Sequence, residues 1–322
     1  MAALPDAPLP QLIELPQLSV EAFETLLDEE IGVWDKRFAW DFRPSADLLR
    51  RFAQIQSLNG CALSYGSDIV GYAYHVCEGR KGLIGDFYVR ASHSSSSDEM
   101  LLLGAIVQAL MLTPGVHRIE SQLMLLNGPL PQPLPFHKHL IRHDRYFMQI
   151  DRSTALGLPA KAAAFRVSFQ SWTERFQEEI ARVVASSYKG HVDSEINDQY
   201  RTISGARHFL LNIVKFPGCG RFSPAASVVA IDESNGRVCG VCLASLISAH
   251  SGHVTQVCVL PAIRGAHLGY ELLRQTLLRL AEVGCTSISL TVTCSNLEAI
   301  RLYESMGFRS QATFPALVWE GF

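Results

Sequence analysis

Between residues 253 and 293 the spacing of apolar positions changes twice, from that of a strand to that of a helix and back. His253–Val259 is predicted as a strand. Ser287–Thr293 alternates polar and apolar residues and is rich in β-branched side chains, which indicates a second strand. Between them, after Gly269, apolar residues recur three and four positions apart, as on a helix that lies on a sheet. These helical positions are Leu272, Leu273, Thr276, Leu277, Leu280 and Ala281. The pattern predicts one βαβ unit.

The segment before this unit favours helices followed by antiparallel strands. Trp172–Tyr188 and residues 194–213 have helical spacing. Ser227–Ile231 and Val238–Ile247 are strand-like and flank a turn-rich run, which predicts a hairpin. The expected order of the second half is therefore two helices, an antiparallel hairpin and the βαβ unit.

The first half of the chain weakly repeats this plan. Cys61–Tyr65 and Ile69–Cys77 predict a hairpin, Leu83–Val89 a third strand, Met100–Leu112 a helix and Arg118–Leu123 a further strand. The two halves are expected to share one fold.

A change of composition at residues 156–164 suggests a domain boundary or linker, because a run of small residues with Gly and Pro follows a strand-like piece. The expected domains are residues 1–155 and 165–322. The predicted fold class is α+β, with a mixed, mostly antiparallel sheet flanked by helices in each domain.

Composition and charge fit a globular chain of about two domains. The chain has 322 residues, of which 48% are hydrophobic, and a formal net charge of −3 at pH 7. Because its basic residues are scattered, we expect no nucleic-acid partner. The apolar stretch Met100–Leu112 is too short to span a membrane, and Met1–Pro5 lacks the basic region of a signal peptide. We therefore expect a cytoplasmic protein without membrane attachment, and leave its oligomeric state open.

The eight cysteines lie mostly in apolar surroundings and are expected to be reduced and buried. Cys239 and Cys242 have the spacing of a metal or redox pair, but they fall within a predicted strand and no second pair accompanies them. We expect no metal site.

Two short motifs bear the chemistry. The strand ending Val257-Cys258-Val259 runs into the glycine-containing loop Arg264–Gly269, which opens the predicted helix. Such a loop leaves backbone N–H groups free at the positive end of the helix dipole, where phosphate binds. Asn296 follows the second strand and precedes a helix whose apolar positions include Tyr303 and which stops at Gly307-Phe308.

These residues resemble the GNAT superfamily of N-acetyltransferases. The family pattern Asn-x-x-Ala-x-x-x-Tyr-x-x-x-Gly-Phe is matched in full from Asn296 to Phe308. In the family's phosphate-loop pattern Arg264 and Gly269 match, whereas His267 replaces the middle glycine. In the first half, Ser94–Ser97 stands where the phosphate glycines should be, and two carboxylates follow it. The chain thus resembles tandem members of the superfamily, with a degenerate N-terminal domain without cofactor.

The resemblance implies acetyl-CoA as co-substrate and assigns roles to individual residues. The backbone N–H groups of Val257 and Val259, on either side of Cys258, would hold the pantetheine arm and polarise the thioester carbonyl, with Asn296 near the pantetheine. Tyr303 would be the general acid towards the departing thiolate. The pyrophosphate would lie on Arg264, Gly265, Ala266, His267, Leu268 and Gly269.

Direct transfer to an amine also requires a base, since an amine with a pKa near 10 is mostly protonated at pH 7. His253, near the start of the strand, is the first candidate, and the alternative is that it is a turn or edge residue. Asp193 and Glu195 could hold a cationic amine, or could be the solvated first turn of a helix.

The predicted function is N-acetyl transfer from acetyl-CoA to a primary amine through a ternary complex. The alternative is a non-catalytic acyl-CoA-binding or regulatory protein, which would follow if His267 and the serine-rich loop both mark decayed sites.

Overall fold

The computed structural model describes residues 9–126 and 133–322, so the first eight residues, for which no signal peptide is expected, lie outside the described part. The chain divides into two units. Unit 1 comprises Met1–Lys36, Phe42–His143 and Phe314–Phe322, and unit 2 comprises Arg37–Asp41 and Asp144–Thr313. The division differs from the boundary expected between residues 155 and 165, because both units contain segments from both halves of the sequence.

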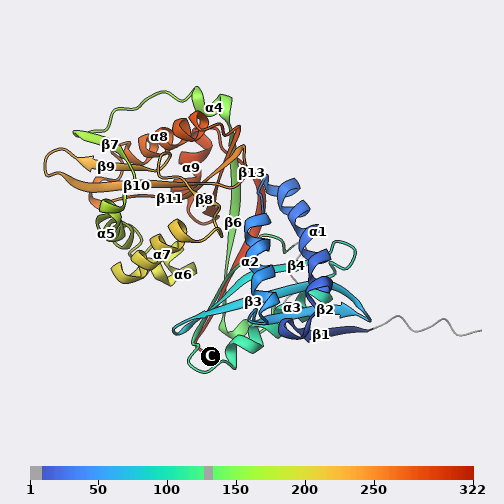
Figure 1. Ribbon diagram of the computed structural model, residues 1–322. Coiled ribbons are helices and arrows are strands. Elements are labelled where there is room, and N and C mark those ends of the chain that lie inside the picture. Colours follow the sequence, from blue (N-terminus) through green and yellow to red (C-terminus); the bar gives the residue numbers. More distant parts are fainter. Residues whose placement is uncertain (1–8, 127–132) are drawn as a thin grey trace, which may run out of the picture. The chain divides into compact units, whose positions relative to one another are not determined.

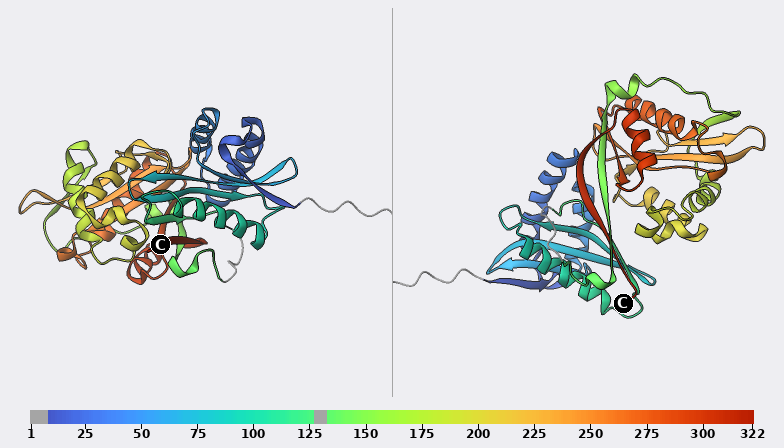
Figure 2. Two further views of the ribbon diagram at one scale, coloured as in Figure 1. Left: turned by 90° about the horizontal axis from the view of Figure 1, so that it is seen from below. Right: turned by 180° about the vertical axis from the view of Figure 1, so that it is seen from behind.

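Unit 1 is a mixed sheet with helices on both faces (Figure 1). Its strands lie in the order β1-β2-β3-β4-β5-β13. The helix α3 packs on one face, where Leu102, Ile106 and Leu110 are fully buried, and Phe23 of α1 packs against Tyr72 on the other. The second view in Figure 2 shows α3 in front of this sheet. The elements are β1 Pro10–Glu14, α1 Val20–Phe38, α2 Arg43–Gln54, β2 Gly60–Tyr65, β3 Asp68–Glu78, β4 Lys81–Val89, α3 Ser96–Met111, β5 Arg118–Gln122 and β13 Arg309–Glu320.

Unit 2 has the same architecture, with strand order β7-β9-β10-β11-β12-β6. The helix α8 packs on one face of the sheet, and α5 and α7 pack on the other (Figure 1). Its elements are β6 Leu140–Asp151, α4 Arg152–Leu156, β7 Val167–Ser171, α5 Gln177–Ser187, α6 Asp193–Ile196, α7 Ile203–Lys215, β8 Arg221–Phe222, β9 Val228–Asp232, β10 Arg237–Leu246, β11 Ser251–Val259, α8 Leu268–Glu282, β12 Ser287–Thr293 and α9 Leu297–Ser305. Short 3-10 helices are η1 Leu15–Gln17, η2 His137–His139, η3 Glu174–Phe176, η4 Asp198–Arg201 and η5 Pro261–Ile263.

Both units have the repeated element order predicted from the sequence, and they also share one detail of strand pairing. In unit 1, β4 pairs in parallel with β5 only from Lys81 to Ile84, and in unit 2, β11 pairs with β12 only from Ser251 to Val254. The next residue, Gly85 in β4 and Thr255 in β11, is skipped in the pairing with the preceding antiparallel strand. Each unit therefore has a β-bulge at the point where two parallel strands separate.

The two halves of the sequence exchange their last strands. β6 follows β5 in the chain, yet from Arg145 to Asp151 it pairs with β12 of unit 2. β13 follows α9 at the end of the chain, yet from Ala316 to Glu320 it pairs with β5 of unit 1. Each sheet is thus completed by a strand from the other half of the sequence.

Most predicted helices and strands are present, but the segment 194–213 is not one helix. It forms α6, η4 and α7, and Thr202 caps α7 by accepting from the N–H of Gly205. A side chain on Gly205 would begin 2.4 Å from the carbonyl oxygen of Gln199. The close approach of these backbones requires glycine and separates α7 from η4.

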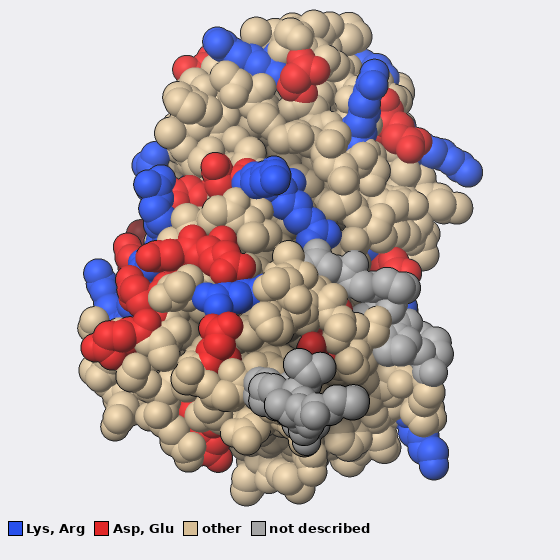
Figure 3. All heavy atoms as spheres, turned by 90° about the vertical axis from the view of Figure 1, so that its right-hand side faces the viewer, with Lys and Arg blue, Asp and Glu red and all other residues tan. Residues whose placement is uncertain are grey.

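Charges of both signs are mixed on the face drawn in Figure 3. In unit 1, for example, Arg50 of α2 lies 2.9 Å from Glu24, 2.7 Å from Asp28 and 2.8 Å from Asp47. Within residues 9–126 and 133–322, no helix combines the length and the apolar character needed to cross a bilayer.

Candidate functional site

A cavity of about 370 Å³ lies in unit 2 where β11 and β12 separate. Their pairing stops at Val254 and Leu290, so the second half of β11 forms a wall of the cavity. The wall also includes the start of α8 and one side of α9. Other lining residues are Arg145, Lys161, Tyr188, His191, Asp193, Tyr200 and Glu298.

The backbone of β11 presents two hydrogen-bond donors to this opening. The N–H of Leu260 donates to the carbonyl of Cys239 on β10, and successive N–H groups of a strand point to opposite sides. Val259 lies opposite Gly240, and Val257 lies opposite Cys242. The N–H groups of Val257 and Val259 therefore point away from β10. On that side β12 has already diverged, so no strand of the described part of the chain pairs with these donors.

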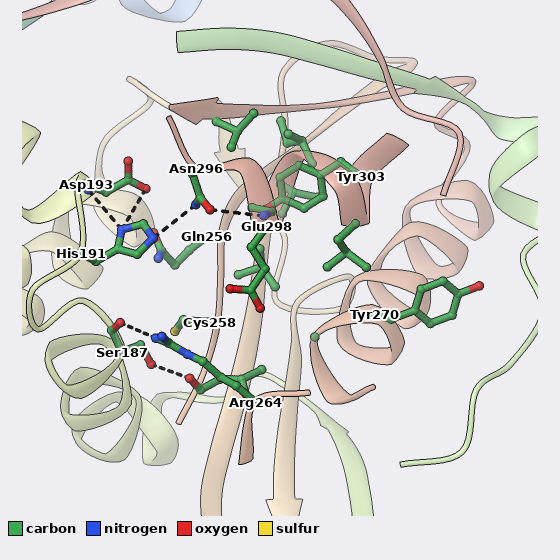
Figure 4. A pocket seen from close by; sticks show the side chains of 18 of the residues that line it. Ser187, His191, Asp193, Gln256, Cys258, Arg264, Tyr270, Asn296, Glu298 and Tyr303 are labelled. Carbon is green, nitrogen blue, oxygen red and sulfur yellow. Dashed lines mark hydrogen bonds and ion pairs between the residues drawn. The ribbon is translucent and has the colours of Figure 1, made fainter. Parts of the chain in front are cut away.

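One end of the cavity is formed by the loop before α8. Arg264 is fixed by a hydrogen bond from its Nη2 to the carbonyl of Ser187, 2.6 Å away (Figure 4). The first intrahelical bond runs from the N–H of Glu271 to the carbonyl of His267. The N–H groups of Leu268, Gly269 and Tyr270 therefore have no acceptor within the helix and lie at its positive end.

His267 occupies the left-handed region with φ 59°, at the position that precedes α8. A non-glycine residue pays about 1 kcal/mol or more for this conformation. Gly265 has φ 81°, and a Cβ placed on it would meet nothing within 4 Å. The loop thus has the shape of an anion cradle with open space over it, at the cost of strain at His267.

A cation from outside both sequence motifs lies beside this loop. Lys161 has its Nζ 4.1 Å from the ring centroid of Tyr270, and both residues line the cavity. The segment that carries Lys161 is anchored by the Tyr270 hydroxyl, which donates to the carbonyl of Pro159. Sequence reasoning missed Lys161, because nothing in the run 156–164 indicated that it folds against the start of α8.

The other motif forms the opposite wall. Asn296 caps α9, since its Oδ1 accepts from the N–H of Ala299, and its Nδ2 lies 3.3 Å from Nε2 of His191 (Figure 4). Tyr303, on the same helix, lines the cavity and is 7% exposed. Burial raises the pKa of Tyr303, so its hydroxyl keeps its proton at neutral pH.

The remaining wall is formed by polar side chains of the segment between α5 and α7, together with Gln256 of β11. Asp193 accepts a hydrogen bond from Thr293 of β12, and its Oδ2 lies 3.9 Å from Nδ1 of His191. Gln256 of β11 accepts from the hydroxyl of Tyr200 and donates to that of Tyr188. This end of the cavity is therefore polar, aromatic and ordered by hydrogen bonds.

The structure brings most predicted residues together but leaves three away from the cavity. His253, Glu195 and Ala266 are not among the described residues that line it, and Glu195 is exposed. The other predicted site residues all line it: Asp193, Val257, Cys258, Val259, Arg264, Gly265, His267, Leu268, Gly269, Asn296 and Tyr303.

His253 is enclosed by its neighbours. Its Nδ1 is 2.9 Å from Ser289 Oγ, and its ring lies between Trp40, with ring centroids 5.2 Å apart, and Phe147, at 6.2 Å. Burial, followed by the charge of Arg145, lowers the pKa of His253 to about 3. The imidazole is therefore neutral and packed at physiological pH, where we expected a base in contact with substrate.

At the equivalent loop in unit 1, polar side chains hydrogen-bond to one another. Ser95 caps α3, the Tyr65 hydroxyl donates to Asp98 at 2.7 Å, and Ser94 donates to Glu99 at 2.6 Å. Two carboxylates thus occupy the position at which the other unit offers free N–H groups, and they would repel a pyrophosphate.

Within the described residues, no three His, Cys, Asp or Glu side chains form a group that could hold a metal ion. Burial raises the pKa of both Cys239 and Cys242, to about 11 and about 12, so neither is a ready thiolate ligand.

Comparisons with known proteins agree with this geometry. Residues 195–308 match the family model described as acetyltransferase (GNAT) family. Among solved structures, a GCN5-related N-acetyltransferase from Sphaerobacter thermophilus aligns with a TM-score of 0.63 at 16% identity, covering 99% of this chain and 97% of that one.

Two further solved structures cover nearly the whole chain. A tandem GNAT protein from the clavulanic acid biosynthesis pathway has a TM-score of 0.61 at 13% identity, covering 97% of this chain and 98% of that chain. A GNAT-family acetyltransferase from Colwellia psychrerythraea has a TM-score of 0.53 at 10% identity, covering 97% and 100%. No curated protein sequence matches the chain. Residues 195–308 therefore match the acetyltransferase (GNAT) family, and the chain as a whole has the fold of tandem GNAT proteins.

Proposed function

We propose that unit 2 transfers an acetyl group from acetyl-CoA to a primary amine by direct attack in a ternary complex. The observation that carries the proposal is the separation of β11 from β12. It leaves the N–H groups of Val257 and Val259 between an anion cradle at one end of the cavity and Tyr303 with Asp193 at the other.

Three features of the cavity suit the binding of acetyl-CoA. The loop Arg264–Gly269 and the first turn of α8 supply N–H groups and positive potential for the pyrophosphate. Lys161 adds a cation near this end. The extended backbone of β11 can pair with the amide groups of the pantetheine arm, as an added strand would. One of its free N–H groups can polarise the thioester carbonyl and stabilise the oxyanion.

Proton transfers follow from the groups on the cavity wall. The amine nitrogen attacks the thioester carbon, a C–N bond forms, and the C–S bond breaks. Tyr303, protonated because of its burial, gives its proton to the departing sulfur. His253 takes no part in this scheme. The described wall residues that can accept the amine proton are His191, Asp193, His267 and Glu298. His267 belongs to the loop proposed for the pyrophosphate, and Asp193 is placed to hold the ammonium beforehand.

Calorimetric titration with acetyl-CoA is the first test. We expect saturable binding at one site per chain, and release of free thiol when a suitable amine is added. Absence of binding at millimolar ligand would refute the proposal. Binding without turnover of any amine would favour a non-catalytic acyl-CoA-binding protein.

Substitution of Tyr303 then tests the mechanism. Tyr303→Phe removes the acid and should lower kcat by about 100-fold while leaving the affinity for acetyl-CoA unchanged. The matched control is Tyr88→Phe, which removes a hydroxyl that donates to Glu29 in unit 1. Equal loss of turnover and affinity would make Tyr303 a structural residue instead.

A further inference from the structure

Opposite charges lie on the cavity wall beside two threonines of β12. Thr291 and Thr293 are two residues apart, so their side chains point to the same face of the sheet. Arg145 donates from its Nη2 to Thr291 Oγ1 at 3.3 Å, and Thr293 donates to Asp193. Both charged residues line the cavity. The guanidinium of Arg145 and the carboxylate of Asp193 are thus each hydrogen-bonded to one of these two threonines within a single cavity.

The spacing of these anchors suits a small zwitterion. Alternate residues of a strand lie about 7 Å apart. An α-amino acid joins its ammonium and carboxylate through one carbon, and a charge-assisted hydrogen bond of about 2.8 Å at each end lets it bridge a separation of this size. The guanidinium fork is also the side-chain group that best matches the planar shape of a carboxylate.

The field at two hydroxyls on the wall reflects the same pair of charges. Burial raises the pKa of Tyr200 and of Tyr303 most. The charge of Asp193 raises both pKa values further, and the charge of Arg145 lowers both. The two charges therefore act on the same part of the cavity, next to the proposed acid Tyr303.

The β-bulge contributes a third polar group. Thr255, the residue skipped in the pairing of β11, lines the cavity, and its Oγ1 is buried without a hydrogen-bond partner among the described residues. A buried hydroxyl without a partner is costly unless a ligand satisfies it. Thr255 is thus available to a bound acceptor or to the thioester.

We infer that the acceptor is a free α-amino acid, with its amino group at Asp193 and its carboxylate at Arg145. The inference rests on the proposed acetyl transfer and narrows its acceptor. An amine without a carboxylate gains nothing from Arg145, and a diamine brings a second positive charge against it.

The test compares acceptors that differ only in the carboxylate. The twenty α-amino acids are assayed with acetyl-CoA against their carboxamides, with thiol release and product mass as readouts. We expect at least one amino acid to be acetylated with a kcat/KM about 10- to 100-fold above that of its amide, which is the usual worth of a hydrogen bond to a charged group. Arg145→Met should abolish this preference by raising KM for the acid much more than KM for the amide.

Controls separate this inference from the proposed function. Arg237→Met, which changes an exposed arginine at the β9–β10 hairpin, should leave the preference intact. If the wild-type protein acetylates the amides as efficiently as the acids, the inference is overturned and the proposed acetyl transfer is not affected. This comparison uses only the wild-type protein, so it does not depend on the folding of a variant. Acetyl-CoA binding with no amino acid acetylated would overturn it as well. Failure to bind acetyl-CoA would instead refute the proposed function.

Discussion

His267 takes the place of a glycine, and the structure explains what a side chain costs at this position. With φ 59° the residue adopts a conformation that glycine reaches freely and histidine reaches with strain. Its side chain is exposed at the rim of the cavity. The loop geometry is thus kept despite the substitution.

We expect His267→Gly to raise the free energy of unfolding by about 1 kcal/mol, because the strain of the left-handed conformation disappears. The affinity for acetyl-CoA should also increase, since a phosphate can approach the bare backbone. Denaturant unfolding and calorimetry measure the two effects. His267→Ala is the control, as it shortens the side chain and keeps the strain. Weaker binding by the glycine variant would mean that the imidazole itself contacts phosphate.

A single skipped residue decides which side chains of β11 share a face. Strict alternation along β11 places His253 and Gln256 on opposite faces. The bulge at Thr255 reverses this parity, so both side chains lie on one face, where His253 contacts Ser289 and Gln256 contacts Tyr200. Bulges have no reliable signature in one sequence, so the facing of individual residues was not predictable here.

At the scale of elements, caps connect the motif residues to stability. Asn296 was selected from the sequence for its place in a family pattern, and in the structure it is the N-cap of α9. The same helix carries Tyr303, so the cap also sets the position of the proposed acid.

Asn296→Ala should lower the free energy of unfolding by about 1 kcal/mol, the usual effect of losing an N-cap. Asn296→Asp keeps an oxygen that accepts from the N–H of Ala299 and should recover most of this loss. It still removes the amide group next to His191. Chemical denaturation distinguishes the variants. An aspartate variant as unstable as the alanine variant would show that capping is not the contribution of Asn296.

The packing of α1 on β3 and β4 contains a buried carboxyl pair. Glu30 accepts from Trp34 at 3.0 Å and from the Tyr72 hydroxyl at 2.7 Å, and Tyr72 also reaches Asp86 at 3.3 Å. Burial raises the pKa of Glu30 well above its usual value and that of Asp86 to about 6. The neighbouring charge of Asp86 raises the pKa of Glu30 further.

This pair makes stability depend on pH. Both pKa values are higher in the folded than in the unfolded state, where carboxyls titrate near 4. Between about pH 4 and above 6 the folded chain therefore binds more protons than the unfolded chain. The stability that the two carboxyls contribute to unit 1 decreases as the pH rises through this window. Melting temperatures measured from pH 4.5 to 7.5 should fall across the window, and Asp86→Asn should flatten the curve. An unchanged slope in the variant would exclude the pair as its source.

At the scale of the whole molecule, the exchange of strands links the two halves of the chain. Unit 2 needs β6 beside β12, and β6 lies before the expected boundary at residues 156–164. Unit 1 needs β13 beside β5, and β13 is the end of the chain. A cut at that boundary therefore leaves each half without one strand of its own sheet.

We expect a fragment of residues 161–322 to be insoluble or unfolded, because β12 has lost its partner strand. A fragment of residues 144–322, which keeps the paired part of β6, should be soluble. Co-expression of residues 1–160 with 161–322 should restore a folded complex. Solubility and circular dichroism are the readouts. A well-folded 161–322 fragment would contradict the requirement for β6.

The sequence by itself determined the local features of this protein. Periodicity located the βαβ unit and the repeat of the fold, and two motifs located the loop before α8 and the capped helix with Tyr303, since these depend on residues close together in the chain. Tertiary structure alone decided the partners of β6 and β13, the approach of Lys161 to the cradle, and the contacts that place Arg145 and Asp193 on the wall of one cavity. These contacts join segments far apart in sequence, and pairing between distant segments depends on which packed arrangement buries the most apolar surface, a property of the whole chain that no local pattern encodes.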